Sequence, residues 1–220
     1  MLLNLTAVRD NIRNRNGKRV FYLAKHDQLT SDARDYLTRE RIEILPAETA
    51  RPERYRLLNG GYMDEKPEHM THLSGDVLVE KTHPRIAFRG AVDLLEAQLL
   101  LCQLELPHLQ KPLEEALQLV RLLLRCEVLG EPVSQMTLGG LDAAALRQRS
   151  HRPQDFYGQP HFMPSATDGR TVLLLNWLRT LARHTELKAV AAMPERTDLL
   201  QALNRLSSYL YILMIQEKCK

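Results

Sequence analysis

Four polar side chains on one predicted helix have the spacing of an anion-binding site. The segment 168–190 reads DGRTVLLLNWLRTLARHTELKAV, and its apolar residues cover more than half of the circumference of a helix. The polar residues that remain lie near one another along one edge: Asn176, Arg179, Arg183 and Glu186. Because a helix this apolar is mostly buried, we expect this edge to face a cleft or a subunit contact. Two guanidinium groups there suit a multiply charged oxyanion such as a polyphosphate.

The same spacing is also typical of a solvated helix edge. Arginine and glutamate side chains three or four residues apart support each other on exposed helices. From these residues alone, an anion site and a solvated edge both stay open.

Composition favours a helical protein that does not bind a highly charged partner such as nucleic acid. The 220 residues suffice for one sizeable core or for a main domain with an appendage. Hydrophobic residues make up 44% and aromatic residues only 5%, which favours helices over a sandwich or barrel. The net charge of +3 is too small to indicate nucleic acid or an anionic membrane as a partner, and we expect neither.

Cysteine usage indicates a reducing compartment. Cys102, Cys126 and Cys219 are odd in number and far apart, so a disulfide framework is not expected. No basic stretch followed by an apolar one opens the chain, and no uncharged stretch is long enough to span a membrane. We therefore expect a soluble, cytoplasmic protein.

Periodicity predicts the elements that position the polar edge. Helices are expected at 85–106, 112–129, 141–150, 168–190 and 196–218. Pro107 stops the first helix, while Pro112 opens the second and Gly130 follows its end. Long helices with short connections predict a mainly α domain, an antiparallel bundle of four to five helices with sites between facing helices.

The first 60 residues differ from the rest of the chain. They predict a strand at 19–24, a helix from Thr30 and Ser31 to Arg39, and a strand at 42–45. We therefore expect a small α/β appendage at 1–60, with no role that we can assign, and a helical domain at 61–220. The polar segment 66–84 lacks helical periodicity and is expected to be a functional loop or an exposed connection.

Several segments, taken in order, resemble one enzyme family. EKTHPRIAFRGAVDLLEAQ, RTLARHTE and LQALNRLSSYLYIL resemble the first helix, the RxxxRxxE helix and the closing LNRLSD helix of the PduO-type corrinoid adenosyltransferases. The resemblance is closer to the EutT-type branch of ethanolamine utilisation, whose KPxxxTHL, PRxxFR and ALNRLSS segments are found at 66–73, 84–89 and 202–208. It covers nearly all of residues 66–215.

This resemblance implies a reaction and its substrates. Such enzymes transfer the 5′-deoxyadenosyl group of ATP, which carries Mg²⁺ on its phosphates, to the cobalt of reduced cobalamin. Since the corrinoid supplies the nucleophile, the protein positions the two substrates and stabilises the charge of the leaving polyphosphate. The resemblance also implies a homo-oligomer with sites between subunits, located in the cytoplasm or associated with a bacterial metabolic compartment.

The resemblance further implies roles for residues of the helical domain. Arg183 would contact the phosphates, while Glu186 and Asn204 would hold the nucleotide. Arg179 would pair with Asp93, bracing the site or the subunit boundary. A buried arginine or aspartate that lost this partner would be left as an unpaired charge.

Further nucleotide contacts are implied before the first helix. Lys81 corresponds to the nucleotide lysine of the family. The glycine-rich phosphate loop of the PduO type corresponds here to Thr71, His72, Ser74 and Gly75, which lack the TGDxG signature of that loop. Backbone amides in this segment would still suit a phosphate.

Phe162, in the sequence HFMP, corresponds to a phenylalanine that presses on the lower face of the corrin. Such a contact favours loss of the axial base and makes cobalt easier to reduce. A single phenylalanine is equally typical of core packing, so both interpretations stay open.

Metal binding is where the chain departs from the family pattern. Some EutT-type enzymes carry a histidine and a CCxxC cluster before the KPxxxTHL segment, whereas this chain has no cysteine before Cys102. His69, His72 and His83 without thiolates form a weak ligand set, so no structural metal is expected.

Two other classes of function remain open. The chain would also suit a helical protein that binds and delivers corrinoid without ATP-dependent catalysis. It would equally suit a structural bundle whose polar edge joins subunits.

Overall fold

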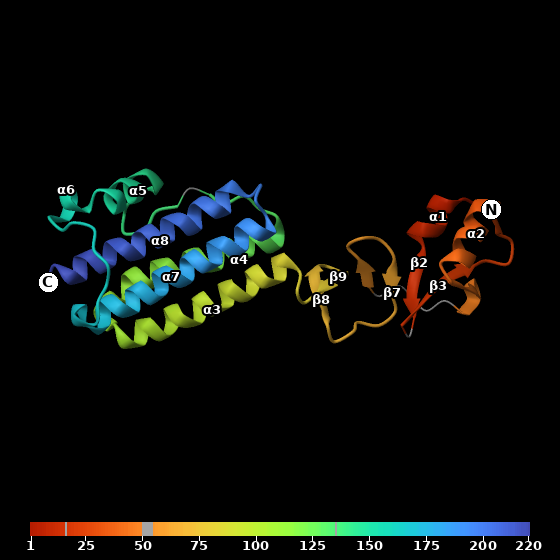
Figure 1. The fold of residues 1–220 in the computed structure, drawn as a ribbon, viewed down its shortest axis with the longest axis horizontal. Helices are drawn as coiled ribbons and strands as arrows, with labels where there is room; N and C mark the ends of the chain where they lie inside the picture. The colour runs from red at the N-terminus through yellow and green to blue at the C-terminus, as the bar shows by residue number, and fades with distance from the viewer. Residues whose placement is uncertain (16, 50–54, 135) are drawn as a thin grey trace. The chain divides into compact units, whose positions relative to one another are not determined.

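The computed structural model describes residues 1–15, 17–49, 55–134 and 136–220 (Figure 1). The chain forms two compact units, Met1–His83 and Pro84–Lys220. The first unit combines short helices with strands, and the second is helical, so the chain is mainly α as predicted. The division after His83 lies later than the expected boundary at residue 60 because the strands that follow residue 60 join the sheet of the first unit.

The N-terminal unit contains a mixed sheet and short helices. Its strands are β1 (Leu2–Leu3), β2 (Ile12–Arg15), β3 (Lys18–Leu23), β4 (Gln28–Leu29), β5 (Glu43–Pro46), β6 (Tyr55–Leu57), β7 (Tyr62–Met63), β8 (Met70–Ser74) and β9 (Val77–Glu80). Its helices are α1 (Leu5–Asp10), α2 (Ser31–Arg39) and the 3-10 helix η1 (Ala47–Thr49). Among the described residues, seven strands pair in the order β5-β3-β2-β7-β6-β9-β8, and β1 pairs with β4 separately.

The first 49 residues have a small apolar core of their own. It is formed by buried side chains from α1, α2 and the neighbouring strands: Val8, Ile12, Phe21, Leu29, Ala33, Leu37 and Ile42. The predicted helix to Arg39 and the two predicted strands are confirmed as α2, β3 and β5, with ends shifted by a residue.

The prediction of a functional loop or exposed connection at 66–84 is wrong for the part that forms strands. β8 and β9 pair as an antiparallel hairpin, with Thr71 opposite Val79 and His72 opposite Leu78. The turn passes through Gly75, whose φ of 54° favours glycine. Apolar residues on both faces of the hairpin are buried, with Met70 and Leu78 on one face and Val79 on the other. These apolar residues are too few to stand out in a polar segment, which is why the hairpin was missed.

The C-terminal unit consists of helices. They are α3 (Pro84–Glu105), η2 (Pro107–Leu109), α4 (Gln110–Leu129), α5 (Ala143–His151), α6 (Pro153–Tyr157), η3 (Ala166–Asp168), α7 (Gly169–Ala192) and α8 (Thr197–Lys218). All five predicted helices are confirmed, and the short α6 is an addition. Gly130 ends α4 in the left-handed conformation, as its place in the sequence predicted.

The long helices pack side by side around one apolar core (Figure 1). α7 contacts α3 and α8, α3 contacts α4, and α5 packs on α8. The fully buried side chains include Leu95, Leu117, Leu175, Leu178 and Leu210. Burying each such leucine contributes about 1.5 to 3 kcal/mol relative to leaving it exposed. Within the described ranges, no helix combines the length and hydrophobicity that crossing a bilayer requires.

α7 is less buried in this single chain than its composition predicted. One face, with Leu175, Leu178 and Ala182, is buried against α3 and α8. On another face Trp177 is 50% exposed and Leu187 is 67% exposed. The expectation of a mostly buried helix is therefore wrong for the chain by itself, because packing neighbours cover only part of the circumference of α7.

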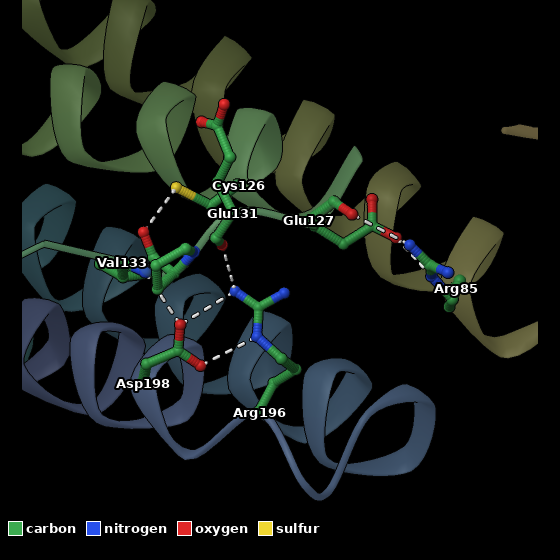
Figure 2. A network of polar contacts seen from close by, with 8 residues as sticks. Arg85, Cys126, Glu127, Glu131, Val133, Arg196 and Asp198 are labelled. Carbon is green, nitrogen blue, oxygen red and sulfur yellow. Dashed lines mark hydrogen bonds and ion pairs between the residues drawn. The ribbon is translucent and has the colours of Figure 1, made fainter. Parts of the chain in front are cut away.

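A buried carboxylate holds the start of α3 to the end of α4 (Figure 2). Glu127 has no exposed surface, and its carboxylate accepts hydrogen bonds from Arg85 Nε at 2.5 Å and Arg89 Nε at 2.7 Å. Arg85 also donates through Nη2 to the Glu127 carbonyl at 3.0 Å. The two arginines of the PRxxFR segment thus form a structural clamp on α4.

A second polar contact joins the start of α8 to the segment after α4 (Figure 2). Arg196 and Asp198 form two hydrogen bonds of 2.9 Å, and Asp198 also accepts one from the Val133 amide at 2.9 Å. Arg196 donates to the Glu131 carbonyl at 2.8 Å. The guanidinium of Arg196 holds the pKa of Asp198 well below its usual range, since it donates to the charged carboxylate.

Candidate active site

A cavity of about 440 Å³ lies within the C-terminal unit, beside α7 and α8. α7 contributes Arg179 and Arg183, the segment before η3 contributes His161, Phe162, Met163 and Pro164, α8 contributes Ser207, Ser208, Tyr211 and Met214, and the end of α5 contributes Ser150 and His151. The cavity therefore combines cationic groups with aromatic and apolar walls. It is of the size and character of a small-molecule site.

The two arginines of the predicted polar edge share this cavity. Arg179 is half-buried, and its Nε and Nη2 donate to Asn176 Oδ1 at 3.1 and 2.9 Å. Burial lowers the pKa of the Arg179 guanidinium, and the nearby charge of Arg183 lowers it further. A bound anion would relieve both the desolvation and the repulsion between the two cations. The arrangement thus suits a multiply charged oxyanion.

One turn beyond Arg183, a hydrogen-bonded group joins α7 to α8. Asn204 Nδ2 donates to Glu186 Oε1 at 2.9 Å, and Asn204 Oδ1 accepts from Arg205 Nη2 at 2.6 Å. Glu186 and Asn204 are half-buried and lie outside the set of residues that line the cavity. The two residues that were predicted to hold the nucleotide are therefore in contact with each other.

Arg205 is a buried cation that the sequence interpretation overlooked. Its side chain is almost fully buried, and its Nε and Nη1 have no hydrogen-bond partner among the described residues. Burial lowers its pKa, as does the charge of Arg147, whereas Glu186 raises it. The available signal was its position directly after Asn204 in the LNRLS segment.

The predicted pair of Arg179 and Asp93 is not formed within this chain. Arg179 binds Asn176, and Asp93 is exposed on α3. Helical periodicity placed each residue on its helix but did not determine which side chain Arg179 would meet. A contact of Arg179 with Asp93 that braces the site or the subunit boundary therefore stays a prediction.

Phe162 lines the cavity and also packs against the helical core. Its ring stacks on Tyr211 with centroids 5.9 Å apart, and its backbone amide donates to Tyr211 Oη at 3.3 Å. Lys218 Nζ lies 4.5 Å from the ring centroid. The structure thus brings Phe162, Arg179 and Arg183 around one space.

The other predicted nucleotide residues belong to the N-terminal unit. Thr71, His72 and Ser74 lie on β8, Gly75 is in the hairpin turn and Lys81 follows β9. His72 Nδ1 lies 3.0 Å from the Gly75 carbonyl oxygen, and its ring meets the edge of Tyr55. The exposed Lys81 has its Nζ 4.0 Å from Glu68 Oε2. These residues form one local group on the hairpin.

The histidines considered as metal ligands have other neighbours. His69 Nε2 lies 3.7 Å from Glu80 Oε1, and His72 lies against the hairpin turn. Within the described part of the chain, no three histidine, cysteine or acidic side chains are grouped as a metal site would require.

Several cavity residues on α8 were missed although a signal existed. Ser207, Ser208 and Tyr211 follow Asn204 by three, four and seven residues, which places them near one face of the helix. Extending the LNRLSS segment by one turn would have indicated Tyr211. His161, in the irregular segment before η3, offered no such periodicity.

Comparison with known proteins matches the greater part of the chain. A family model described as cobalamin adenosyltransferase matches residues 61–217. A protein named corrinoid adenosyltransferase EutT from Salmonella typhimurium is 36% identical over 163 residues, which are 71% of this chain and 61% of that protein. A protein of the same name from Escherichia coli K12 is 37% identical over 158 residues, 69% of this chain and 59% of that protein. The chain thus spans about three fifths of the length of these relatives.

Proposed function

This chain belongs to the cobalamin adenosyltransferase family, and on that premise we propose that it transfers the 5′-deoxyadenosyl group of ATP to the cobalt of a reduced corrinoid. The product would be adenosylcobalamin, and the similarity to the EutT proteins supports a role in ethanolamine utilisation. One observation carries the proposal: a single cavity combines Arg179 and Arg183 with the aromatic wall of Phe162. Such a cavity offers cations to a polyphosphate and an apolar face to a large planar ring.

The reaction forms a cobalt–carbon bond and breaks a carbon–oxygen bond. The electron pair of cob(I)alamin attacks C5′ of ATP, and the pair of the broken C5′–O bond leaves with the triphosphate. Negative charge therefore grows on the leaving oxygen in the transition state. Arg183 and Arg179 would stabilise that charge, and removal of one such electrostatic donor typically slows a reaction by about 10² to 10³.

The remaining residues would hold the two substrates. Glu186 and Asn204 would exchange part of their mutual contact for the nucleotide, and Phe162 would press on the corrin. For the hairpin residues Lys81, Thr71, His72, Ser74 and Gly75 we propose a phosphate-binding role, as the resemblance implies. Mg²⁺ would bind to the phosphates of ATP, which present the hard oxygen ligands that it prefers.

We propose that the helices form an antiparallel bundle that assembles with further copies of the chain. Apolar side chains remain exposed on α3 and α7, among them Leu101, Leu104, Trp177 and Leu187. An exposed apolar surface of this kind is typical of a protein contact. Asp93 is exposed on α3 and would then be free to meet Arg179 of a second copy. The three cysteines are free thiols, which fits a reducing cytoplasm.

The test is formation of adenosylcobalamin by the full chain from MgATP and chemically reduced cobalamin, followed by its absorption spectrum. Arg183→Ala should lower kcat/KM by about 10² to 10³ while the helical circular dichroism is retained. Arg170→Ala is the matched control, because Arg170 lies on the same helix, is exposed and binds Glu105. Its activity should stay within a few fold of the original.

The alternatives predict different results. A chain that binds corrinoid but gives no product under strong reduction, and shows no MgATP binding by calorimetry, would be a delivery protein. Loss of assembly in Arg179→Ala with unchanged nucleotide affinity would indicate a structural role for the polar edge.

A further inference from the structure

A chain of hydrogen bonds anchors the backbone of Phe162. His161 Nε2 lies 3.1 Å from the His151 carbonyl oxygen, and His161 Nδ1 lies 3.1 Å from Tyr211 Oη. The amide of Phe162 donates to the same Tyr211 oxygen at 3.3 Å. Three segments, the end of α5, the irregular segment before η3 and α8, are thus joined through two side chains.

The direction of these hydrogen bonds follows from the chemistry of each group. The His151 carbonyl can only accept, so His161 Nε2 carries the hydrogen. In the neutral imidazole Nδ1 is then an acceptor, and the Tyr211 hydroxyl donates its proton to it. The Tyr211 oxygen keeps lone pairs for the Phe162 amide. Each group in the chain has the partner that its chemistry requires.

Ring contacts reinforce the same arrangement. The His161 and Tyr211 rings are nearly parallel, with an interplanar angle of 10° and centroids 5.7 Å apart. Phe162 also stacks on Tyr211, and Lys218 lies against the Phe162 ring while pairing with Asp168. The position of Phe162 is therefore defined through Tyr211 and Lys218, both on α8.

Among the described contacts of this segment, the packing of Phe162 on the helical core is only partial. The next residue, Met163, is 90% exposed, and His161 itself is exposed. Phe162 is only half-buried, so burial alone does not fix its ring. The hydroxyl of Tyr211 is the group that both neighbours share, and phenylalanine at this position would keep the stacking but lose both hydrogen bonds.

We propose that His161 and Tyr211 are positioning residues that hold the Phe162 ring against the corrin. This inference rests on the proposed function. A ring that stays in place excludes the axial base of cobalamin from cobalt, whereas a ring that moves lets the base return. Losing one hydrogen bond weakens such an arrangement by about two- to tenfold in the equilibrium between the two positions.

The test measures coordination rather than activity alone. Cob(II)alamin is added to the full chain with MgATP, and electron paramagnetic resonance gives the ratio of cobalt without to cobalt with the axial nitrogen. Tyr211→Phe removes both hydrogen bonds, so it should lower this ratio by more than the roughly two- to tenfold of a single bond and lower kcat, while KM for ATP stays unchanged. His161→Ala should also lower this ratio. His161→Gln retains a donor and an acceptor, so its ratio should lie between those of His161→Ala and the original chain.

Two further variants make the outcome decisive. Phe162→Ala removes the ring itself, so cobalt should keep its axial nitrogen and the measured ratio should reach its lowest value. Tyr157→Phe is the matched control, since the Tyr157 hydroxyl is buried without a hydrogen-bond partner among the described residues and Tyr157 does not line the cavity. It should leave the ratio unchanged.

The possible failures are distinguishable. If Phe162→Ala changes the ratio but Tyr211→Phe and His161→Ala do not, the positioning role is wrong and the proposed function stands. If the original chain does not bind cob(II)alamin, the proposed function itself is wrong. His161 lies on the surface, so His161→Ala keeps the test open if Tyr211→Phe impairs folding.

Discussion

Removing the charge of Glu127 should strongly destabilise the C-terminal unit. The Glu127 carboxylate is fully buried and bound by the guanidinium groups of Arg85 and Arg89, whose side chains are only 28% and 18% exposed. Glu127→Gln keeps the shape of the side chain but leaves these cations without their carboxylate. Breaking a buried ion pair in this way costs about 3 to 5 kcal/mol. That is a large part of the roughly 5 to 15 kcal/mol by which a typical domain is stable.

The measurement is urea unfolding of the full chain, followed by tryptophan fluorescence. Trp177 is the only tryptophan of the sequence and lies on α7, so its emission reports on the C-terminal unit. With a slope of about 2 kcal/mol per molar urea, the expected loss lowers the midpoint by roughly 2 M. The triple variant Arg85→Met, Arg89→Met, Glu127→Leu should recover most of it, because no buried charge is then stranded.

The control is an exposed ion pair between α4 and the segment that follows it. Arg125 and Glu131 lie 3.6 Å apart with both side chains about half exposed or more, so Arg125→Ala should cost less than about 1 kcal/mol. If the free energy of unfolding of Glu127→Gln lies within about 1 kcal/mol of that of the original chain, the contact of Glu127 with Arg85 and Arg89 contributes no more than a surface ion pair. The argument from burial would then be refuted.

Three further predictions use the same unfolding assay. Asp198→Asn should lower the stability by about 1 to 3 kcal/mol at neutral pH, because Arg196 would lose the negative charge to which it donates. Since the folded chain lowers the pKa of Asp198, the pair stabilises fully above about pH 4 and this contribution is lost as pH falls, so the difference should shrink in acid. Gly139→Ala should cost about 1 to 3 kcal/mol, since Gly139 has a φ of 59° and an added Cβ would lie 2.9 Å from the Tyr209 ring; no measurable loss would contradict this. Tyr157→Phe should be neutral or stabilising by up to about 1 kcal/mol, because its buried hydroxyl lacks a partner among the described residues; a clear loss would reveal one.

Helical periodicity accounts for most of what the sequence predicted correctly. The five expected helices and the small α/β start follow from apolar spacing and from stop signals such as Pro107 and Gly130. The sheet was largely missed because β6 and β7 are two or three residues long and carry no readable alternation. The hairpin of β8 and β9 pairs with β6 and was also missed, because its sequence is polar and typical of a loop.

For the candidate site, the sequence predicted which residues share a helix better than what they contact. The steps from Arg179 to Arg183 placed two cations together, and the structure has both at one cavity. The contact of Arg179 with Asn176 depends on side-chain geometry that spacing does not determine. His161 and Tyr211 come from segments 50 residues apart, so only the folded chain shows that they meet.

The buried guanidinium of Arg205 lowers the stability of the C-terminal unit at the LNRLS segment of α8. Two of its donors lack acceptors within the described residues, whereas leucine or methionine at this position of α8 would leave no polar group to satisfy. An unsatisfied buried donor typically lowers stability by about 1 to 3 kcal/mol. Proteins retain such local faults mainly where activity requires them. The closing helix therefore gives up some stability of the folded chain and keeps a polar group among apolar neighbours.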